Sequence, residues 1–155
     1  MATWPADQRI SPIRVLVVDD YKEFRELVCL ILGKNQKVQV IGEASDGSEA
    51  VSKAVELKPD LILLDIDLPR LTGIEAARQI GERVSESKVI FLSAETSADL
   101  VQQALTSGAW GYVLKTNIGS DLLAAVEAVL LGRRFVSMEL SGVEQVPERE
   151  AESHR

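Results

Sequence analysis

Apolar residues along the chain form five short continuous runs, separated by longer segments in which apolar residues recur every three or four positions. The runs are IRVLVV (13–18), VQVIGEA (38–44), DLILLD (60–65), KVIFLS (88–93) and WGYVLK (110–115). Continuous apolar runs of this length predict buried strands, and the spacing between them predicts amphipathic helices. Strand and helix alternate five times. This alternation predicts a three-layer α/β fold, with a parallel sheet covered by helices on both faces.

The alternation of strand and helix stops near Gly132. Residues 133–155 hold a short apolar patch followed mainly by charged and small residues. We therefore expect one domain over residues 12–136, an N-terminal extension over residues 1–11 and a flexible charged tail over residues 137–155.

Composition and charge exclude several classes of protein. The 155 residues carry 24 acidic and 17 basic side chains, a net charge of −7. The chain therefore lacks the positive field that draws proteins to nucleic acid or to anionic membranes. A single cysteine, Cys29, allows no disulfide within the chain, and the sequence contains neither a signal-peptide pattern nor a membrane-spanning run. We expect a cytoplasmic protein without membrane contact, and no DNA binding by this chain.

Polar residues gather where the predicted strands end. They are Asp19 and Asp20, Asp65 and Asp67, Ser93, and Lys115. Loops are commonly polar, so each residue alone carries little weight. Ligands of open parallel sheets bind outside the carboxyl ends of the strands, so the whole set predicts a functional site at that edge.

The residue types at this edge indicate phosphoryl chemistry. Carboxylates held together repel one another unless a cation joins them, and oxygen donors suit Mg²⁺ or Mn²⁺. Zinc would need histidine or cysteine, of which the chain has only His154 and Cys29. A metal with a lysine and a hydroxyl opposite suits a phosphoryl group. The sequence has no P-loop and no histidine near these residues, so an ionised aspartate is the best nucleophile, and Asp65 is the best placed.

Four motifs, taken together and in this order, resemble the receiver domains of two-component response regulators. VLVVDD is similar to the family's acidic pair, LILLDIDLPRLTG to its phosphoacceptor segment, FLSAE to its hydroxyl-bearing strand end and GAWGYVLK to its lysine motif. The resemblance spans roughly residues 12–132. It implies a flavodoxin-like (CheY-like) doubly wound sheet of five strands in the order 2-1-3-4-5.

The resemblance also implies a role for each acidic residue. Asp65 would be phosphorylated. Asp20, Asp65 and the backbone carbonyl of Asp67 would bind Mg²⁺, with Asp19 acting mainly through the waters of the metal.

Three further residues acquire roles from the same resemblance. Lys115 would neutralise the phosphoryl charge, and Ser93 would donate a hydrogen bond to a phosphoryl oxygen. Tyr112 matches the switch aromatic of the family, and the alternative is that it simply packs in its strand. If Tyr112 is the switch, phosphorylation would draw Ser93 inward and leave space for Tyr112 to turn toward the interior.

The implied function is that of a phosphorylatable switch. A sensor histidine kinase or a phosphotransfer protein would supply the phosphoryl group. The contacts of the face formed by the fourth helix, fifth strand and fifth helix would then change, with a phosphorylation-dependent homodimer as one outcome. The activity implied is Mg²⁺-dependent self-phosphorylation and dephosphorylation at Asp65, which leaves open whether the protein counts as an enzyme.

One alternative concerns the output of the switch. GAWGYVLK and AAVEAVLLGRRFVS are most similar to receivers that are joined to a LuxR-like helix-turn-helix domain. The chain would then be the receiver part of a DNA-binding transcriptional regulator whose output domain is missing from it.

Overall fold

The computed structural model of the chain describes residues 11–137, which are built around one parallel sheet. Its strands are β1 (Ile13–Val18), β2 (Val38–Ala44), β3 (Leu61–Asp65), β4 (Lys88–Ser93), β5 (Gly111–Leu114) and β6 (Phe135–Val136). Its helices are α1 (Lys22–Leu32), α2 (Gly47–Leu57), α3 (Gly73–Arg83), α4 (Ala98–Thr106) and α5 (Ile118–Leu130), with the short 3-10 helix η2 (Lys115–Asn117) before α5. The predicted α/β fold is confirmed.

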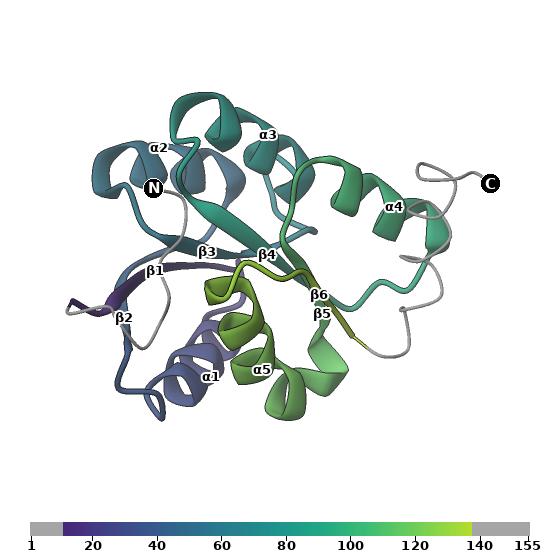
Figure 1. Ribbon diagram of the computed structural model, residues 1–155. Helices are drawn as coiled ribbons and strands as arrows, with labels where there is room; N and C mark the ends of the chain where they lie inside the picture. The colour runs from purple at the N-terminus through teal and green to yellow at the C-terminus, as the bar shows by residue number, and fades with distance from the viewer. Residues whose placement is uncertain (1–10, 138–155) are drawn as a thin grey trace.

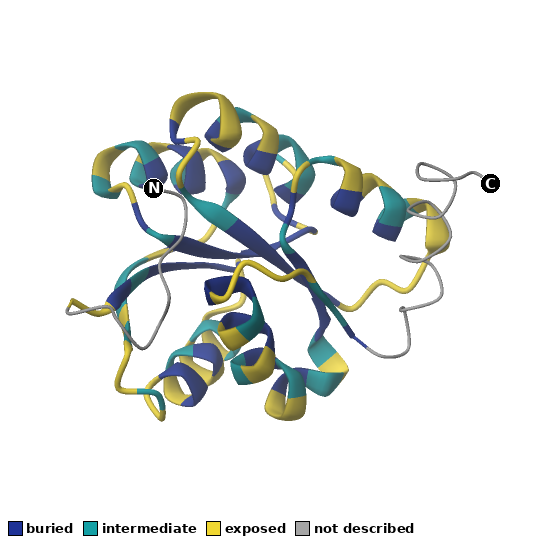
Figure 2. Cartoon of the chain, viewed as in Figure 1, coloured by how far each residue is buried: buried dark blue, intermediate teal, exposed yellow. Residues whose placement is uncertain are grey.

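Helices cover both faces of the sheet, α1 and α5 on one face and α2, α3 and α4 on the other (Figure 1). Each face has its own apolar core. Val28 of α1 and Leu122 of α5 belong to one core, and Ala54 of α2 and Ala76 of α3 to the other. Every residue of β3 is buried, and the central strands are mostly dark in Figure 2. Burial on both faces explains why the strands are continuous apolar runs rather than alternating ones.

The sheet has six strands in the order β2-β1-β3-β4-β5-β6. The predicted order holds for the first five strands, but the predicted number of five is wrong. The additional strand, β6, pairs in parallel with β5, with Phe135 opposite Gly111 and Val136 opposite Tyr112. Two residues leave no periodic pattern in a sequence, which is why this strand was missed.

Ser137 continues this edge of the sheet as the last described residue, and it is fully buried. Its N–H donates to the carbonyl of Tyr112 at 3.0 Å, and its hydroxyl accepts from the N–H of Leu114 at 3.0 Å and donates to Asp121 at 2.9 Å. The chain that follows α5 is thus tied to β5 directly before Lys115. The predicted domain limits stay a prediction, because residues 1–10 and 138–155 lie outside the described part of the chain.

Gly73 allows α3 to begin directly against the end of β3. A Cβ at this position would lie 2.1 Å from the carbonyl oxygen of Asp65, so no larger residue fits without moving the backbone. The N–H of Gly73 donates to the carbonyl of Ile66 at 2.8 Å, and the hydroxyl of Thr72 caps the helix by accepting from the N–H of Glu75. The glycine that follows Asp65 in the phosphoacceptor motif therefore has a steric role.

Among residues 11–137, none of the helices has the length and apolar character that crossing a membrane requires.

Candidate functional site

Strands β1, β3 and β5 end at the same edge of the sheet and bring four charged side chains together there. Asp19 and Asp20 follow β1, Asp65 ends β3 and Lys115 follows β5. One carboxylate oxygen from each of the three aspartates lies within 4.8 Å of the others. Asp19 and Asp65 are buried, with 1% and 3% of their surface exposed, and Asp20 is exposed. We call Asp19, Asp20, Asp65 and Lys115 the acidic pocket.

Lys115 is the cation of the acidic pocket. Its Nζ lies 2.7 Å from Oδ2 of Asp19 and 3.4 Å from Oδ2 of Asp65. The same ammonium lies 4.5 Å from the centre of the Phe24 ring, a cation–π distance. Lys115 is therefore held by two carboxylates and by the face of an aromatic ring from α1.

Burial, followed by the negative charge of Asp19, raises the pKa of Asp65 to about 6, although Lys115 and the N–H of Asp67 act to lower it. Burial acts to lower the pKa of Lys115, but its hydrogen bond to Asp19 and the charge of Asp65 outweigh burial and raise that pKa. Lys115 therefore stays an ammonium, and the acidic pocket keeps more negative charge than one lysine can balance.

The donor set of the acidic pocket fits a hard divalent cation. Three carboxylates offer oxygen ligands, one of them reaches solvent, and the excess negative charge favours a dication. The side chain of Asp67 is exposed and does not belong to this group of three. Its backbone N–H donates to Oδ1 of Asp65 at 3.2 Å, which holds the turn after β3 against the pocket.

Ser93 and Tyr112 form a second, uncharged group at the same edge of the sheet, which we call the hydroxyl pair. Both residues are fully buried. The hydroxyl of Ser93 accepts from the N–H of Glu95 at 2.9 Å, and the hydroxyl of Tyr112 donates to the carbonyl of Glu95 at 2.9 Å. The two hydroxyls therefore hold both backbone groups of Glu95, in the loop between β4 and α4. Burial raises the pKa of Tyr112, so this hydroxyl stays a donor.

The position of Tyr112 differs from the sequence-based expectation. We expected phosphorylation to leave space for Tyr112 to turn inward, whereas the structure already has the ring inside, packed in the core next to α4. A switch at this residue would therefore act by changing the population or the hydrogen bonds of the inward form.

Two contacts of α1 with the acidic pocket were not predicted. The ring of Phe24 lies under the ammonium of Lys115. Nη1 of Arg25 donates to the carbonyl of Asp19 at 2.7 Å. Neither contact has a signal in the sequence, because a helical pattern does not reveal which turn faces the end of a strand.

A parallel α/β sheet that brings three aspartates and a lysine together at its carboxyl edge is the arrangement expected of a receiver. The response regulator receiver domain family matches residues 15–127. The chain belongs to this family, as the motifs predicted.

Relatives and solved structures agree with this family. The chain is 38% identical over 130 residues to the transcriptional regulatory protein LiaR of Bacillus subtilis (strain 168). This match covers 84% of this chain and 62% of LiaR. It is similar to a two-component response regulator of the LuxR family from Aurantimonas sp. SI85-9A1, with a TM-score of 0.82, 30% identity, and coverage of 92% of this chain and 100% of that one. It is also similar to the signal receiver domain of the putative response regulator NarL from Mycobacterium tuberculosis, with a TM-score of 0.75, 34% identity, and coverage of 79% and 99%.

The chain spans 53% to 62% of the length of the first curated relatives that it matches. The family match over residues 15–127 shows a receiver domain, and one of the similar structures is a response regulator of the LuxR family.

Proposed function

We propose that the chain accepts a phosphoryl group on Asp65 and passes on the signal through altered protein contacts. The observation that carries this proposal is the acidic pocket itself. In this pocket, an oxygen of the buried Asp65 carboxylate lies within 4.8 Å of oxygens of Asp19 and Asp20. Oδ2 of Asp65 lies 3.4 Å from the ammonium of Lys115. Such a carboxylate is ionised above its pKa of about 6, so it needs no base to act as a nucleophile.

The phosphoryl donor is the phosphohistidine of a sensor histidine kinase or of a phosphotransfer protein. An oxygen of Asp65 forms the new P–O bond, and the P–N bond of the phosphohistidine breaks. The leaving nitrogen keeps the electron pair of that bond and takes a proton from solvent. Lys115 would neutralise charge on the phosphoryl group, a role supported by its 3.4 Å distance from Asp65, and the hydroxyl of Ser93, which accepts from the N–H of Glu95, would donate its own O–H to a phosphoryl oxygen.

Mg²⁺ is the cation proposed for the acidic pocket, and Mn²⁺ is an alternative of the same ligand chemistry. Asp20, Asp65 and the carbonyl of Asp67 would hold it, and Asp19 would act mainly through the waters of the metal. When bound, the metal supplies positive charge against the phosphoryl oxygens.

The experiment is to incubate the protein with acetyl phosphate, with Mg²⁺ or with EDTA, and to follow intact mass. The unaltered chain should gain one phosphoryl group only with Mg²⁺. Asp65→Asn should gain none, and Asp20→Asn should need more Mg²⁺. Glu82→Gln, which changes an exposed acid near the far end of α3, is the matched control and should be labelled normally. Undiminished labelling of Asp65→Asn would overturn the assignment.

The output proposed is a contact made through the face formed by α4, β5 and α5. A phosphoryl group at Asp65 adds charge and acceptor atoms beside Ser93, and the hydroxyl pair joins that change to the loop before α4 and to β5. Beryllofluoride with Mg²⁺ should then promote homodimerisation or partner binding, and Tyr112→Ala should weaken this response while sparing phosphorylation. An unchanged sedimentation profile, with NMR shifts confined to the acidic pocket, would contradict it.

A cytoplasmic location is part of this proposal, because the histidine kinases that would phosphorylate Asp65 act on their partners there.

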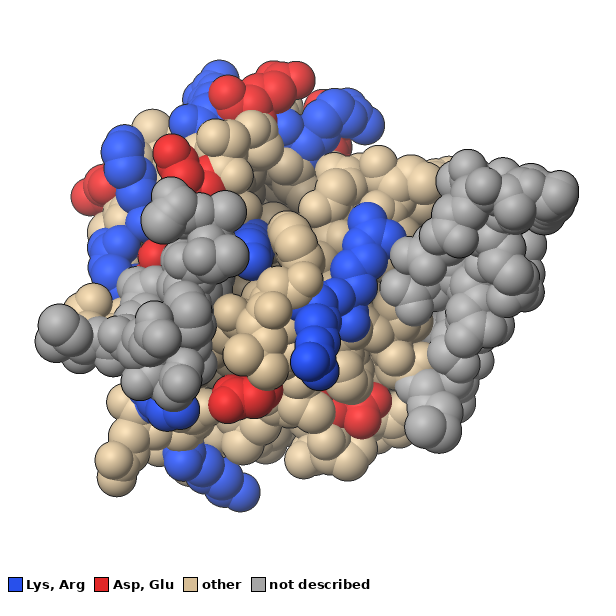
Figure 3. Space-filling model, in the orientation of Figure 1, with Lys and Arg blue, Asp and Glu red and all other residues tan. Residues whose placement is uncertain are grey.

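A second candidate is favoured by the relatives. LiaR is named a transcriptional regulatory protein, and its match covers 84% of this chain. The chain would then act within a longer DNA-binding regulator. In the visible face of the described residues, basic and acidic side chains both occur and no continuous basic surface forms (Figure 3). In this candidate, DNA binding would reside in another domain, and reading the gene beyond codon 155 for a helix-turn-helix tests it.

A further inference from the structure

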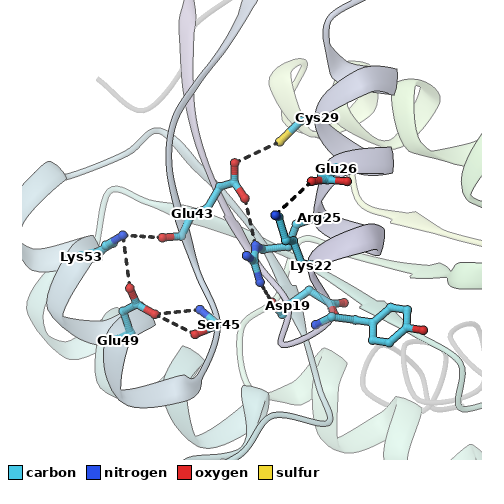
Figure 4. A network of polar contacts seen from close by, with 10 residues as sticks. Asp19, Lys22, Arg25, Glu26, Cys29, Glu43, Ser45, Glu49 and Lys53 are labelled. Atoms are coloured by element: carbon cyan, nitrogen blue, oxygen red, sulfur yellow. Dashed lines mark hydrogen bonds and ion pairs between the residues drawn. The ribbon is translucent and has the colours of Figure 1, made fainter.

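Arg25 connects the acidic pocket to two other elements of the fold. Its Nη1 donates to the carbonyl of Asp19 at 2.7 Å, and its Nε donates to Oε1 of Glu43 at 2.9 Å (Figure 4). Only 16% of the arginine side chain is exposed, whereas Lys22, on the same helix, is 74% exposed and pairs with Glu26 at the surface. Arg25 therefore faces the end of β1 from α1 and is not a solvated helix charge.

The bond to Asp19 acts on the backbone between the two acids of the pocket. The peptide group is planar, so holding the carbonyl of Asp19 also sets the direction in which the chain enters Asp20. The side chain of Asp19 is held as well, because Oδ1 accepts from the N–H of Tyr21 at 2.9 Å and Oδ2 accepts from Lys115. The side chain of Tyr21, the N-cap residue of α1, makes no capping hydrogen bond. The turn that carries both acids thus depends on Asp19 and on Arg25.

Glu43 holds the guanidinium in place from the neighbouring strand. It lies in β2 opposite Val17 of β1, and its backbone carbonyl accepts from Nζ of Lys53 on α2. An arginine offers its donors in a fixed planar fork, so it can bond to Glu43 and Asp19 at once. A lysine at the same place has one ammonium and lacks that fork.

We infer that Arg25 is a positioning residue of the acidic pocket: it holds Asp19 and Asp20 in the arrangement that binds Mg²⁺, and Glu43 orients it. This inference rests on the proposed metal site. Groups that orient metal ligands commonly change metal affinity by about 10- to 100-fold when they are removed.

The experiment measures the Mg²⁺ dissociation constant by calorimetry at low ionic strength, well below the melting temperature. Arg25→Ala should raise this constant by about tenfold or more. Arg25→Lys keeps the charge but loses the fork, and it should resemble Arg25→Ala more than the unaltered chain. Lys22→Ala removes one positive charge from the same helix without touching Asp19, and it should change the constant by less than about twofold.

Glu43 provides the second pair of variants. Glu43→Gln keeps an acceptor oxygen for Nε of Arg25 and should keep most of the Mg²⁺ affinity. Glu43→Ala removes that oxygen and should raise the Mg²⁺ dissociation constant, as Arg25→Ala does. Two further readouts accompany each constant. They are the free energy of unfolding in EDTA, and the NMR shift of the Tyr21 amide, which reports the turn between the two acids.

The outcomes separate this inference from the proposed function. If the unaltered chain binds Mg²⁺ and both Arg25 variants bind it equally well while only their stability falls, Arg25 is merely structural and the inference is wrong. If Arg25→Lys matches the unaltered chain, charge alone matters and the positioning role is wrong. If the unaltered chain binds no Mg²⁺ at all, the proposed metal site fails and the inference fails with it.

Discussion

The acidic pocket and the hydroxyl pair lie at the same edge of the sheet, and Asp19 and Asp65 of the pocket are buried nearly as deeply as the pair, yet the two groups differ in electrostatics. Asp19 and Asp65 expose 1% and 3% of their surface, and Ser93 and Tyr112 expose none. The acidic pocket sets three carboxylates against one ammonium. The hydroxyl pair contains only neutral groups, and each hydroxyl is bonded to the backbone of Glu95.

Equal burial therefore has unequal consequences. A neutral hydroxyl loses little on burial when it keeps a hydrogen bond, but like charges that are buried together oppose folding until a proton or a cation joins them. The raised pKa of Asp65 is a direct expression of this cost. The acidic pocket is thus the part of the site whose energy changes when a charged ligand arrives, and the hydroxyl pair is the part that is already satisfied.

The largest expected effect is on the cation of the acidic pocket. Lys115→Met leaves Asp19 and Asp65 without their ammonium partner, and it should lower the free energy of unfolding at pH 7 in EDTA by about 3 kcal/mol. Urea denaturation measures this loss. The double variant Lys115→Met/Asp65→Asn should recover much of it, because one of the opposed charges is gone. The exposed Lys22→Met is the control and should cost less than about 0.5 kcal/mol. A loss below about 1 kcal/mol for Lys115→Met would show that Lys115 is not what balances the pocket.

Asp65→Asn should act in the opposite direction. Burial and Asp19 raise the folded-state pKa of Asp65 to about 6 from its ordinary value of 3.8, so the folded chain binds this proton more tightly than the unfolded chain does. The ionised carboxylate therefore lowers stability as the pH rises from 3.8 through about 6. Without metal, the asparagine variant should be more stable than the unaltered chain by about 2 to 3 kcal/mol at pH 7.5, and by little near pH 4.

Unfolding curves at several pH values check this prediction, with Glu82→Gln as an exposed control whose effect should stay small at every pH. A stability difference that did not vary with pH would show that the effect of Asp65→Asn does not come from ionisation of the carboxylate. The contrast between the charged acidic pocket and the neutral hydroxyl pair would then fail.

The sequence predicted more of this edge than of the contacts that support it. Three of the five apolar runs coincide with observed strands, at 13–18, 38–44 and 88–93, because a strand buried on both faces leaves an unbroken apolar run. Residues that end such strands must share an edge, so Asp19, Asp65 and Lys115 could be placed together before any distance was known.

Other features depend on tertiary contacts that no local pattern encodes. Arg25 is one of several charged residues in the first turns of α1, and the pattern is the same whether its guanidinium meets solvent or the carbonyl of Asp19. Tyr112 could be placed in a strand, but its inward position depends on the loop at Glu95. β6 has two residues, which is too short for any period to be recognised.

Mg²⁺ should stabilise the protein through the acidic pocket alone. A ligand that binds only the folded state at ten times its dissociation constant raises the free energy of unfolding by about 1.4 kcal/mol, and the effect grows with concentration. Thermal unfolding in low-salt buffer measures this rise. Asp20→Asn should reduce it, and Tyr112→Phe should leave it intact, because the hydroxyl pair takes no part in holding the metal. A melting temperature that Mg²⁺ leaves unchanged would contradict the metal site.

The smallest expected effect tests the neutral half of the comparison. Tyr112→Phe removes the hydroxyl that donates to the carbonyl of Glu95, so one partly buried acceptor loses its partner while the packing of the ring is kept. A bond of this kind contributes about 1 kcal/mol, and the loss should be independent of pH between about 5 and 8, because no group involved changes its charge there.

Urea denaturation of Tyr112→Phe beside Asp65→Asn, on one pH series, makes the comparison directly. Phosphorylation of Asp65 by acetyl phosphate should continue in Tyr112→Phe, because the tyrosine does not contact the carboxylates. A loss that varied with pH in step with Asp65 would mean that the hydroxyl pair is coupled to the acidic pocket even without a phosphoryl group, and the two groups would then have to be treated as one.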